Sequence, residues 1–144
     1  MLLRVVVDTN NIISGTIMNH GPSYETLEAW RKGEFILLTS KAIIKEVERV
    51  LHYPRIQKKY HLTEKKIKQV VNNLIKYAVV TPGELKLKVI KEDPPDNEVL
   101  ACAVEGKANF IVSGDEDLKR LNIYRGIRII DAKEFVKNIL PHNQ

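Results

Sequence analysis

The sequence Val5-Val6-Val7-Asp8-Thr9-Asn10 places three β-branched residues directly before a run of polar ones. A short apolar run without alternation is typical of a strand that is buried on both faces. Strands of that kind belong to parallel sheets covered by helices. Open parallel sheets bind ligands outside the carboxyl ends of their strands, so Asp8 stands at a candidate site.

The same kind of element recurs along the chain. We expect further buried strands at 35–38, 110–112 and 127–130. We expect amphipathic helices over 23–32, 40–51, 63–75, 96–105 and 131–139, with N-caps at Ser23, Ser40, Thr63, Asp96 and Asp131. Pro94-Pro95 favours an extended chain before the fourth helix. The pattern predicts an α/β fold, with a central mostly parallel β-sheet flanked by helices on both faces.

Length and composition bound the class of protein. The 144 residues suit a single domain spanning 1–144, without repeats or linkers. The one cysteine, Cys102, excludes an internal disulfide and suits a reducing cytosol. The N-terminus does not resemble a signal peptide, and no apolar stretch approaches the roughly 18 residues of a membrane helix. We therefore expect a cytoplasmic protein without a membrane partner.

The charge is unevenly distributed. The formal net charge is +5, whereas the window 41–68 alone carries +6. Its basic residues are Lys41, Lys45, Arg49, Arg55, Lys58, Lys59, Lys65, Lys66 and Lys68. A basic segment on a near-neutral body suggests a polyanionic partner, although a solvated helix surface explains it equally well. Aromatic and basic residues alternate over 53–60, so Arg55, Lys58 and Lys59 are candidates for clamping single-stranded RNA. An ordinary connection between helices is the alternative.

Acidic residues fall where a parallel sheet would gather them. Asp8 follows the first strand directly, and Asp115 follows the strand at 110–112 after two small residues, with Asp117 close behind. Glu46 lies in the second turn of a helix that starts near a strand end, and Asp96 opens another helix. We expect Asp8, Glu46, Asp96 and Asp115 to share one pocket at the carboxyl edge of the sheet.

Clustered carboxylates point to a hard divalent cation. Neighbouring carboxylates raise one another's pKa unless a cation intervenes, and oxygen ligands select Mg²⁺, Mn²⁺ or Ca²⁺. A cation in such a site can activate water and stabilise the leaving oxygen of a phosphodiester. Without the five acids named above, 13 acidic and 23 basic residues remain, which suits a phosphate backbone as partner.

Each of these acids also has a purely structural explanation. Asp8 could close a turn, Asp96 could be only a helix N-cap, and Asp115 and Asp117 lie in a glycine-containing turn. Glu46 could be a solvated helix residue. Their combination in this order is what favours a site. Other chemistries have less support, because the four histidines lack metal-ligand spacing and we find neither a glycine-rich phosphate loop nor a nucleophilic serine motif.

With these residues identified, the chain resembles the PIN-domain family over nearly its full length. The opening 5–10, the helix segment 43–47, the segment 96–103 and the turn 111–118 are similar to the four acidic motifs of that family. The Ser113-Gly114-Asp115 form resembles a subgroup of prokaryotic, VapC-like toxins of toxin–antitoxin pairs.

The resemblance implies a Mg²⁺- or Mn²⁺-dependent endoribonuclease, commonly a homodimer, with RNA as substrate and an antitoxin protein as a partner. It implies that Asp8, Glu46, Asp96 and Asp115 are metal ligands. It implies that Asp117 is an auxiliary acid and that Asn10 and Ser113 are polar supports. Alternatives are an inactive nucleic-acid-binding or regulatory PIN module and a housekeeping RNA-processing nuclease. An aspartyl-phosphate phosphatase is disfavoured, because Asn10 stands where its second aspartate belongs.

Overall fold

A six-stranded sheet forms the centre of the computed structural model, which describes residues 2–90 and 93–141. Its strands, in the spatial order β3-β2-β1-β4-β6-β5, are β1 (Arg4–Val7), β2 (Ile36–Ser40), β3 (Val79–Thr81), β4 (Phe110–Val112), β5 (Ile123–Tyr124) and β6 (Ile127–Ile130). Neighbouring strands are parallel except for β5 and β6. The predicted mostly parallel α/β fold is therefore confirmed.

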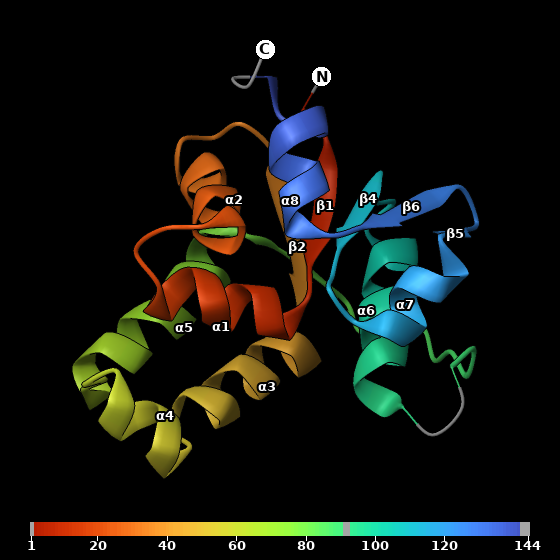
Figure 1. Ribbon diagram of the computed structural model, residues 1–144. Helices are drawn as coiled ribbons and strands as arrows, with labels where there is room; N and C mark the ends of the chain where they lie inside the picture. The colour runs from red at the N-terminus through yellow and green to blue at the C-terminus, as the bar shows by residue number, and fades with distance from the viewer. Residues whose placement is uncertain (1, 91–92, 142–144) are drawn as a thin grey trace.

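Helices cover both sides of the central strands. They are α1 (Thr9–Ile17), α2 (Pro22–Arg31), α3 (Lys41–Leu51), α4 (Pro54–Lys59), α5 (Glu64–Tyr77), α6 (Pro94–Glu105), α7 (Glu116–Leu121) and α8 (Ala132–Glu134), which continues as the π-helical turn η1 (Phe135–Ile139). Helices α1, α2 and α5 lie on one side of β1 and β2, and α6 lies on the other (Figure 1). None of the helices formed by the described residues is long and apolar enough to cross a bilayer.

Strand β1 lies at the centre of the hydrophobic core. Val5, Val6 and Val7 are almost completely buried, and Val6 is paired with Leu38 of β2 on one side and Ile111 of β4 on the other. The N–H of Asp8 continues the ladder by donating to the C=O of Val112 at 2.9 Å. Because β1 and β4 are parallel neighbours, the residues that follow them emerge side by side at the carboxyl edge of the sheet.

Three of the predicted N-caps are confirmed. The Ser40 Oγ accepts a hydrogen bond from the N–H of Ile43, and the Thr63 Oγ1 accepts one from the N–H of Lys66. The Asp131 carboxylate accepts one from the N–H of Glu134. Each bond satisfies a backbone donor that has no partner in the first helical turn. Ser40 thereby fixes the start of α3 at the end of β2.

The other two predicted N-caps, Ser23 and Asp96, are wrong for one shared reason. Helix α2 begins at Pro22 and α6 begins at Pro94, so their N-caps are Gly21 and Asp93. Proline is well tolerated in the first helical turn, where its missing N–H would have no partner anyway. The prolines therefore open these helices instead of preceding them. Asp96 consequently lies within the first turn of α6.

Several elements were not expected from the sequence, namely α1, α4, α7, β3 and β5. Helix α1 contains Thr9, Asn10, Asn11, Ser14 and Gly15, which have weak helix propensity. Its packing against α2 compensates: a Cβ on Gly15 would lie 2.6 Å from the carbonyl oxygen of Ser23. Glycine is therefore the residue that permits this close approach of the two helices.

Candidate metal centre

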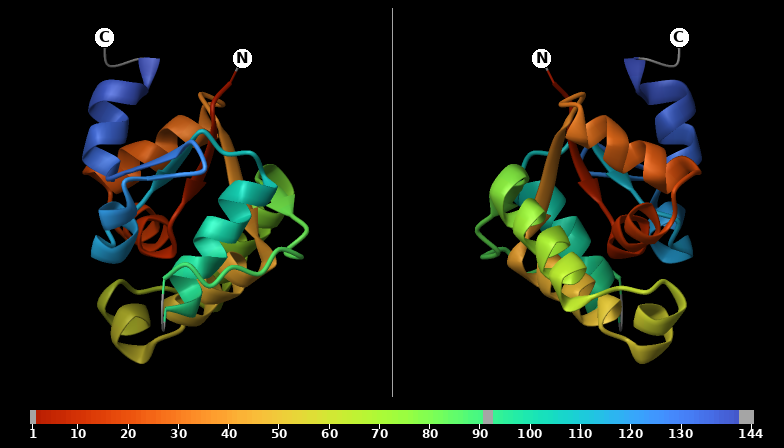
Figure 2. Two further views of the ribbon diagram at one scale, coloured as in Figure 1. Left: turned by 90° about the vertical axis from the view of Figure 1, so that its right-hand side faces the viewer. Right: turned by 90° about the vertical axis from the view of Figure 1, so that its left-hand side faces the viewer.

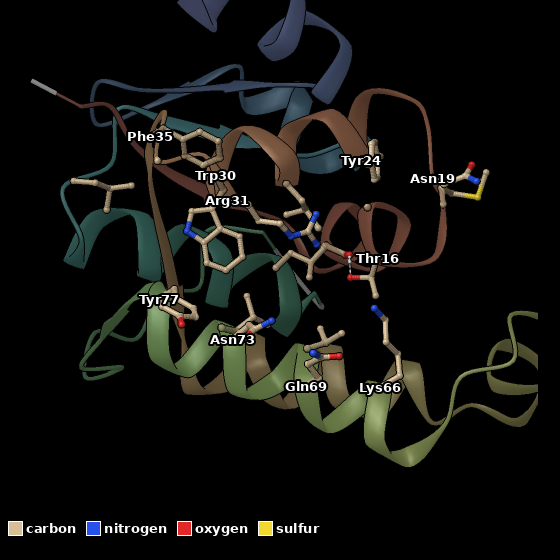
Figure 3. A pocket seen from close by; sticks show the side chains of 18 of the residues that line it. Thr16, Asn19, Tyr24, Trp30, Arg31, Phe35, Lys66, Gln69, Asn73 and Tyr77 are labelled. Carbon is tan, nitrogen blue, oxygen red and sulfur yellow. Dashed lines mark hydrogen bonds between the residues drawn. The ribbon is translucent and has the colours of Figure 1, made fainter.

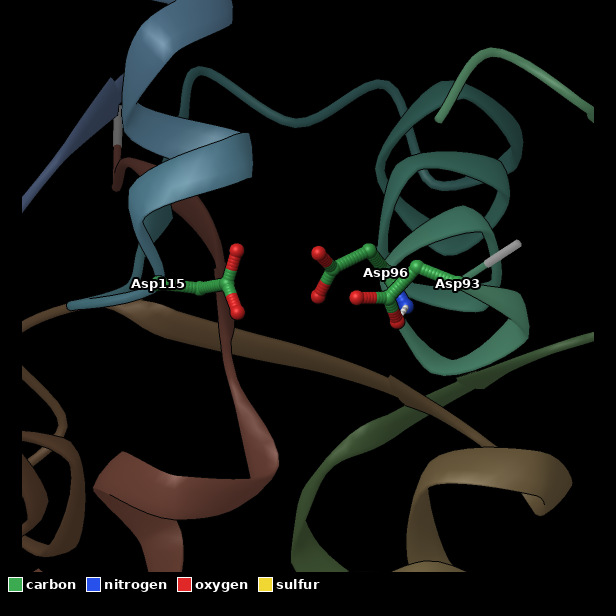
Figure 4. Close-up of side chains that lie close together, drawn as sticks. All are labelled: Asp93, Asp96 and Asp115. Carbon is green, nitrogen blue, oxygen red and sulfur yellow. Dashed lines mark hydrogen bonds between the residues drawn. The ribbon is translucent and has the colours of Figure 1, made fainter. Parts of the chain in front are cut away.

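Three carboxylates converge beyond the carboxyl ends of β1 and β4. One oxygen from each of Asp93, Asp96 and Asp115 lies within 4.8 Å of the other two. Asp93 and Asp96 belong to the start of α6, whereas Asp115 precedes α7 and faces them from the opposite side (Figure 4). We call Asp93, Asp96 and Asp115 the acidic triad.

Local hydrogen bonds hold two members of the triad in place. Asp93 is the N-cap of α6, and its Oδ1 accepts a hydrogen bond from the N–H of Asp96 at 3.2 Å. Asp115 is the N-cap of α7, and its Oδ1 accepts from the N–H groups of Asp117 and Leu118. Each capping aspartate uses Oδ1 for its own helix. The two helix starts thus bring carboxylates together from opposite sides.

Asp96 is the buried member of the triad, with 4% of its surface exposed. Burial, together with the neighbouring carboxyls of Asp115 and Asp93, raises the pKa of Asp96 to about 8. Its Oδ2 is buried, and no donor among the described residues forms a hydrogen bond with it. An unpartnered buried carboxylate oxygen is costly, so this atom requires either a proton or a cation.

Asp8 lies beside the triad but is not a member of it. Burial raises the pKa of Asp8, the hydroxyl of Ser113 opposes this by donating to Asp8, and the charges of Asp115 and Asp93 raise the pKa further. Ser113 Oγ also accepts a hydrogen bond from the N–H of Asp115 at 3.0 Å. Ser113 therefore ties Asp8 to the third member of the triad.

Glu46 is held by another partner. It lies on α3, outside the acidic triad, and Arg49 binds both of its carboxylate oxygens. The guanidinium of Arg49 also donates to the hydroxyl of Tyr53 and stacks over that ring at 5.3 Å from its centroid. A cation would have to compete with this guanidinium for the Glu46 carboxylate.

Asn10 and Asp117 line a cavity next to the triad. This cavity of about 560 Å³ is bounded by the start of α1 and the start of α7, and Asp115 also contributes to its wall. Asp117 Oδ1 accepts a hydrogen bond from Arg120 at 3.1 Å, and Asn10 is exposed. The cavity thus connects the triad to polar groups that could contact a substrate.

The basic side chains of the window 41–68 are all exposed. Arg55, Lys58 and Lys59 lie on α4, which joins α3 to α5 and projects beyond the carboxyl ends of the strands (Figures 1 and 2). The ammonium of Lys59 stacks over the ring of Tyr60 at 5.4 Å from its centroid. The positive charge is therefore displayed on the same side of the molecule as the triad.

A larger, mostly apolar cavity of about 840 Å³ lies between α1, α2 and α5 (Figure 3). Trp30 and Tyr77 contribute aromatic walls, whereas Arg31 and Lys66 are the charged residues of its lining. None of the triad residues lines it. It is therefore a second candidate surface, separate from the acidic site.

The residues of the triad fit a divalent cation. Their donor set consists of carboxylate oxygens, which Mg²⁺ and Mn²⁺ prefer. Among the described residues, no lysine or arginine forms an ion pair with Asp93, Asp96 or Asp115. A cation would neutralise the negative charges of the three carboxylates and would also give Asp96 Oδ2 a partner.

Asp93 is the member of the triad that the sequence analysis missed. It lies directly before Pro94-Pro95, a pair that from the sequence alone predicts an extended segment outside the helix. The available signal was the spacing Asp93-Pro94-Pro95-Asp96, in which an N-cap and the third helical residue can approach each other.

Comparison with known proteins identifies the family of the chain. The family model of the PIN domain matches residues 4–117, a range that contains Asp8, Glu46 and the whole acidic triad. The chain is also 30% identical over 134 residues to MJ1680, an uncharacterized protein of Methanocaldococcus jannaschii, in an alignment covering 91% of this chain and 84% of that protein. The chain therefore belongs to the PIN-domain family.

Proposed function

We propose that the chain is a metal-dependent endoribonuclease that hydrolyses RNA phosphodiester bonds at the acidic triad. The observation that carries the proposal is the convergence of Asp93, Asp96 and Asp115 around an unpartnered, buried oxygen of Asp96. Membership of the PIN-domain family supports a nuclease. RNA as the substrate and the cytoplasm as the location are parts of the proposal.

The roles of the residues follow from their surroundings. Asp93, Asp96 and Asp115 would hold Mg²⁺ or Mn²⁺, and Asp8 would act as a further ligand whose orientation is set by Ser113. A bound divalent cation supplies Lewis-acid stabilisation of the negative charge that develops on a phosphodiester during hydrolysis. Asp117 and Asn10 line the adjoining cavity and would contact the substrate there.

Glu46 remains a proposed ligand on one condition. Its carboxylate is bound by Arg49, so it becomes available to a cation only when that ion pair opens. The exposed Arg55, Lys58 and Lys59 of α4 would bind the phosphate backbone of RNA through charge. Catalytic and binding groups would then lie on the same side of the molecule.

The direct test is cleavage of a labelled single-stranded RNA with Mn²⁺, for the wild type and for Asp96→Asn. We expect cleavage by the wild type only, because the variant keeps the shape of the side chain but removes a central ligand. Glu98→Gln is the matched control, since it removes one negative charge from the same helix without touching the triad. A wild type that neither cleaves varied RNAs nor is stabilised by Mn²⁺ would indicate an inactive binding module.

We further propose that the large cavity receives a segment of a protein partner, such as the antitoxin of a toxin–antitoxin pair. Among the described residues, its lining includes the cationic Arg31 and Lys66 and no acidic residue. Arg31 is paired with Glu28 outside the lining, so Lys66 in particular favours an apolar segment that carries an acidic side chain. Trp30 is the one tryptophan of the chain and lines this cavity, so its fluorescence reports occupancy. Titration with the protein encoded beside this one should shift Trp30 emission, and Tyr77→Ala should weaken the effect.

We also propose self-association as a homodimer. Strand β3 lies at an edge of the sheet, and both Val79 and Val80 are exposed there. Exposed apolar residues on an edge strand are an unusual feature for a monomer. Light scattering should give the mass of a dimer, and Val80→Lys should convert it to a monomer.

A further inference from the structure

Asn97, the residue after Asp96, binds the chain that precedes helix α6. Its Oδ1 accepts hydrogen bonds from the N–H groups of Val89 at 3.0 Å and Ile90 at 2.9 Å. Its Nδ2 donates to the C=O of Ile90 at 2.8 Å. A primary amide is the side-chain group that can both accept and donate in this way, so the three bonds together specify the asparagine.

The main chain of Asn97 binds Asp93 at the same time. The N–H of Asn97 donates to the C=O of Asp93 at 3.2 Å. The side chain of Asp93 in turn caps helix α6 by accepting a hydrogen bond from the N–H of Asp96. Ile90 and Asp93 are three chain steps apart, which span at most about 11 Å. Fixing Ile90 to Asn97 therefore restricts where Asp93 can lie.

We propose that Asn97 is a positioning residue of the metal centre, which holds Asp93 against Asp96 and Asp115. The inference rests on the proposed function, because it concerns the geometry of the same site. Asn97 acts through Asp93 and is not itself a member of the triad. Residues that orient metal ligands in this way change metal affinity by about 10- to 100-fold when they are replaced.

Glu105 offers a matched control at the other end of α6. Its carboxylate accepts hydrogen bonds from the N–H groups of Gly83, Glu84 and Leu85 at 3.0, 3.0 and 3.2 Å. It therefore binds the same connecting segment with as many hydrogen bonds as the Asn97 side chain. Glu105 lies eight residues beyond Asn97, which is about 12 Å along the helix. It is therefore distant from Asp93.

The test compares the affinity for Mn²⁺ of the wild type, Asn97→Ala and Glu105→Ala by isothermal titration calorimetry. We expect Asn97→Ala to bind Mn²⁺ at least about tenfold more weakly, and Glu105→Ala to stay near the wild type. Equal losses in both variants would attribute the effect to general destabilisation and overturn the inference. So would unchanged affinity in Asn97→Ala.

A second measurement without metal separates this inference from the proposed function. The N–H of Asp96 is bonded to Asp93 Oδ1, so its hydrogen exchange reports whether Asp93 is in place. We expect faster exchange at Asp96 in Asn97→Ala but not in Glu105→Ala. If the wild type binds no Mn²⁺, the metal centre is wrong, and the exchange data alone decide whether Asn97 positions Asp93. Exchange at Asp96 that is the same in all three proteins overturns the positioning role.

A further variant covers the case in which Asn97→Ala does not fold. Asn97→Asp keeps the acceptor for the N–H groups of Val89 and Ile90 but removes the donor to the C=O of Ile90. It also adds a negative charge next to the triad, which by itself would strengthen cation binding. Weaker Mn²⁺ binding with faster Asp96 exchange would therefore support the inference, and unchanged values of both would overturn it.

Discussion

Ser113 donates a hydrogen bond of 2.6 Å from its Oγ to Oδ2 of Asp8, a residue 105 positions away in the sequence. The two side chains follow the parallel neighbours β1 and β4, and both are buried. This bond, together with a weaker one from the backbone N–H of Thr9, opposes the effect of burial on Asp8, whose pKa is nevertheless raised. The protonation of Asp8 thus depends in part on a hydroxyl that follows the adjacent strand.

Replacing Ser113 should weaken metal binding in a pH-dependent manner. In Ser113→Ala, burial and the charges of Asp115 and Asp93 raise the pKa of Asp8 without opposition from the hydroxyl. Protons then compete better with Mn²⁺, so we expect about tenfold weaker affinity at the acidic end of the pH range in which both proteins are folded. The loss should shrink as the pH rises, because Asp8 is then ionised in both proteins. Calorimetric titrations over a series of pH values measure this.

Ser23→Ala is the control for Ser113→Ala. It also removes one hydroxyl that takes part in a hydrogen bond, in this case with Asn11 Nδ2 at 3.0 Å. Its Mn²⁺ affinity should match that of the wild type at every pH. A loss in Ser113→Ala that is the same at every pH would contradict the role of Asp8 protonation.

The raised pKa of Asp96 makes a prediction about stability. Its pKa lies at about 8 in the fold against an ordinary value of 3.8, so between these values the folded protein retains a proton that the unfolded chain has released. The contribution of Asp96 to the free energy of unfolding is therefore most favourable at low pH and is lost as the pH rises towards 8. Without metal, Asp96→Asn should melt above the wild type, by a margin that grows across this range.

Measuring the difference between the two melting temperatures removes the contribution of the other titrating groups. Added Mn²⁺ should reverse the order, because a cation stabilises the wild type by mass action and the variant less. If Asp96 were only a residue of the first helical turn, the difference between the two melting temperatures would not change with pH or with metal. That result would contradict a role of Asp96 as a metal ligand.

Sequence reasoning located the triad only in part, for identifiable reasons. Asp8 and Asp115 could be placed at one edge, since β-branched runs identify buried strands and parallel strands share a carboxyl edge. Asp93 was missed because Pro94 and Pro95 disfavour a helix everywhere except in its first turn. The apolar periodicity does not distinguish prolines in the first turn of a helix from prolines in an extended segment before it.

The surroundings of Glu46 could not be predicted either. A glutamate and an arginine three residues apart on a helix often pair, but a carboxylate at a cation site can equally bind metal. Which partner prevails depends on distances that the order of residues does not give. In the structure Arg49 binds Glu46 and is itself held by Tyr53, whose side chain is brought there by the end of α3.

The Arg49–Glu46 pair gives a prediction of its own. If the ion pair with Arg49 keeps Glu46 from binding metal, Arg49→Gln should strengthen Mn²⁺ binding. In this variant the cation no longer competes with a guanidinium for the Glu46 carboxylate. The gain should vanish in the double variant Arg49→Gln/Glu46→Gln, which has no carboxylate to offer at that position. Equal gains in the single and double variants would show that Arg49 acts only through long-range charge.

The last prediction concerns α4 as the RNA-binding surface. Lys58 and Lys59 are exposed on this helix, which projects beyond the carboxyl ends of the strands (Figure 2). Reversing both charges, with Lys58→Glu and Lys59→Glu, should weaken the affinity for single-stranded RNA. It should also flatten the dependence of log K on log salt by about 1.4, since each phosphate contact to a single strand contributes roughly 0.7. Binding measured by fluorescence anisotropy over a range of salt concentrations gives both values.

The matched control for α4 reverses Lys32 and Lys107, which precede strands β2 and β4 and so lie towards the opposite edge of the sheet. Both are exposed, and the total change in charge is the same. A purely nonspecific effect of net charge would weaken RNA binding equally in the two double variants. A binding surface on α4 requires that only the Lys58/Lys59 variant lose slope, because counterions are released only where the protein meets phosphate. If the slope of that variant equals the wild-type slope, α4 is a solvated connection between α3 and α5.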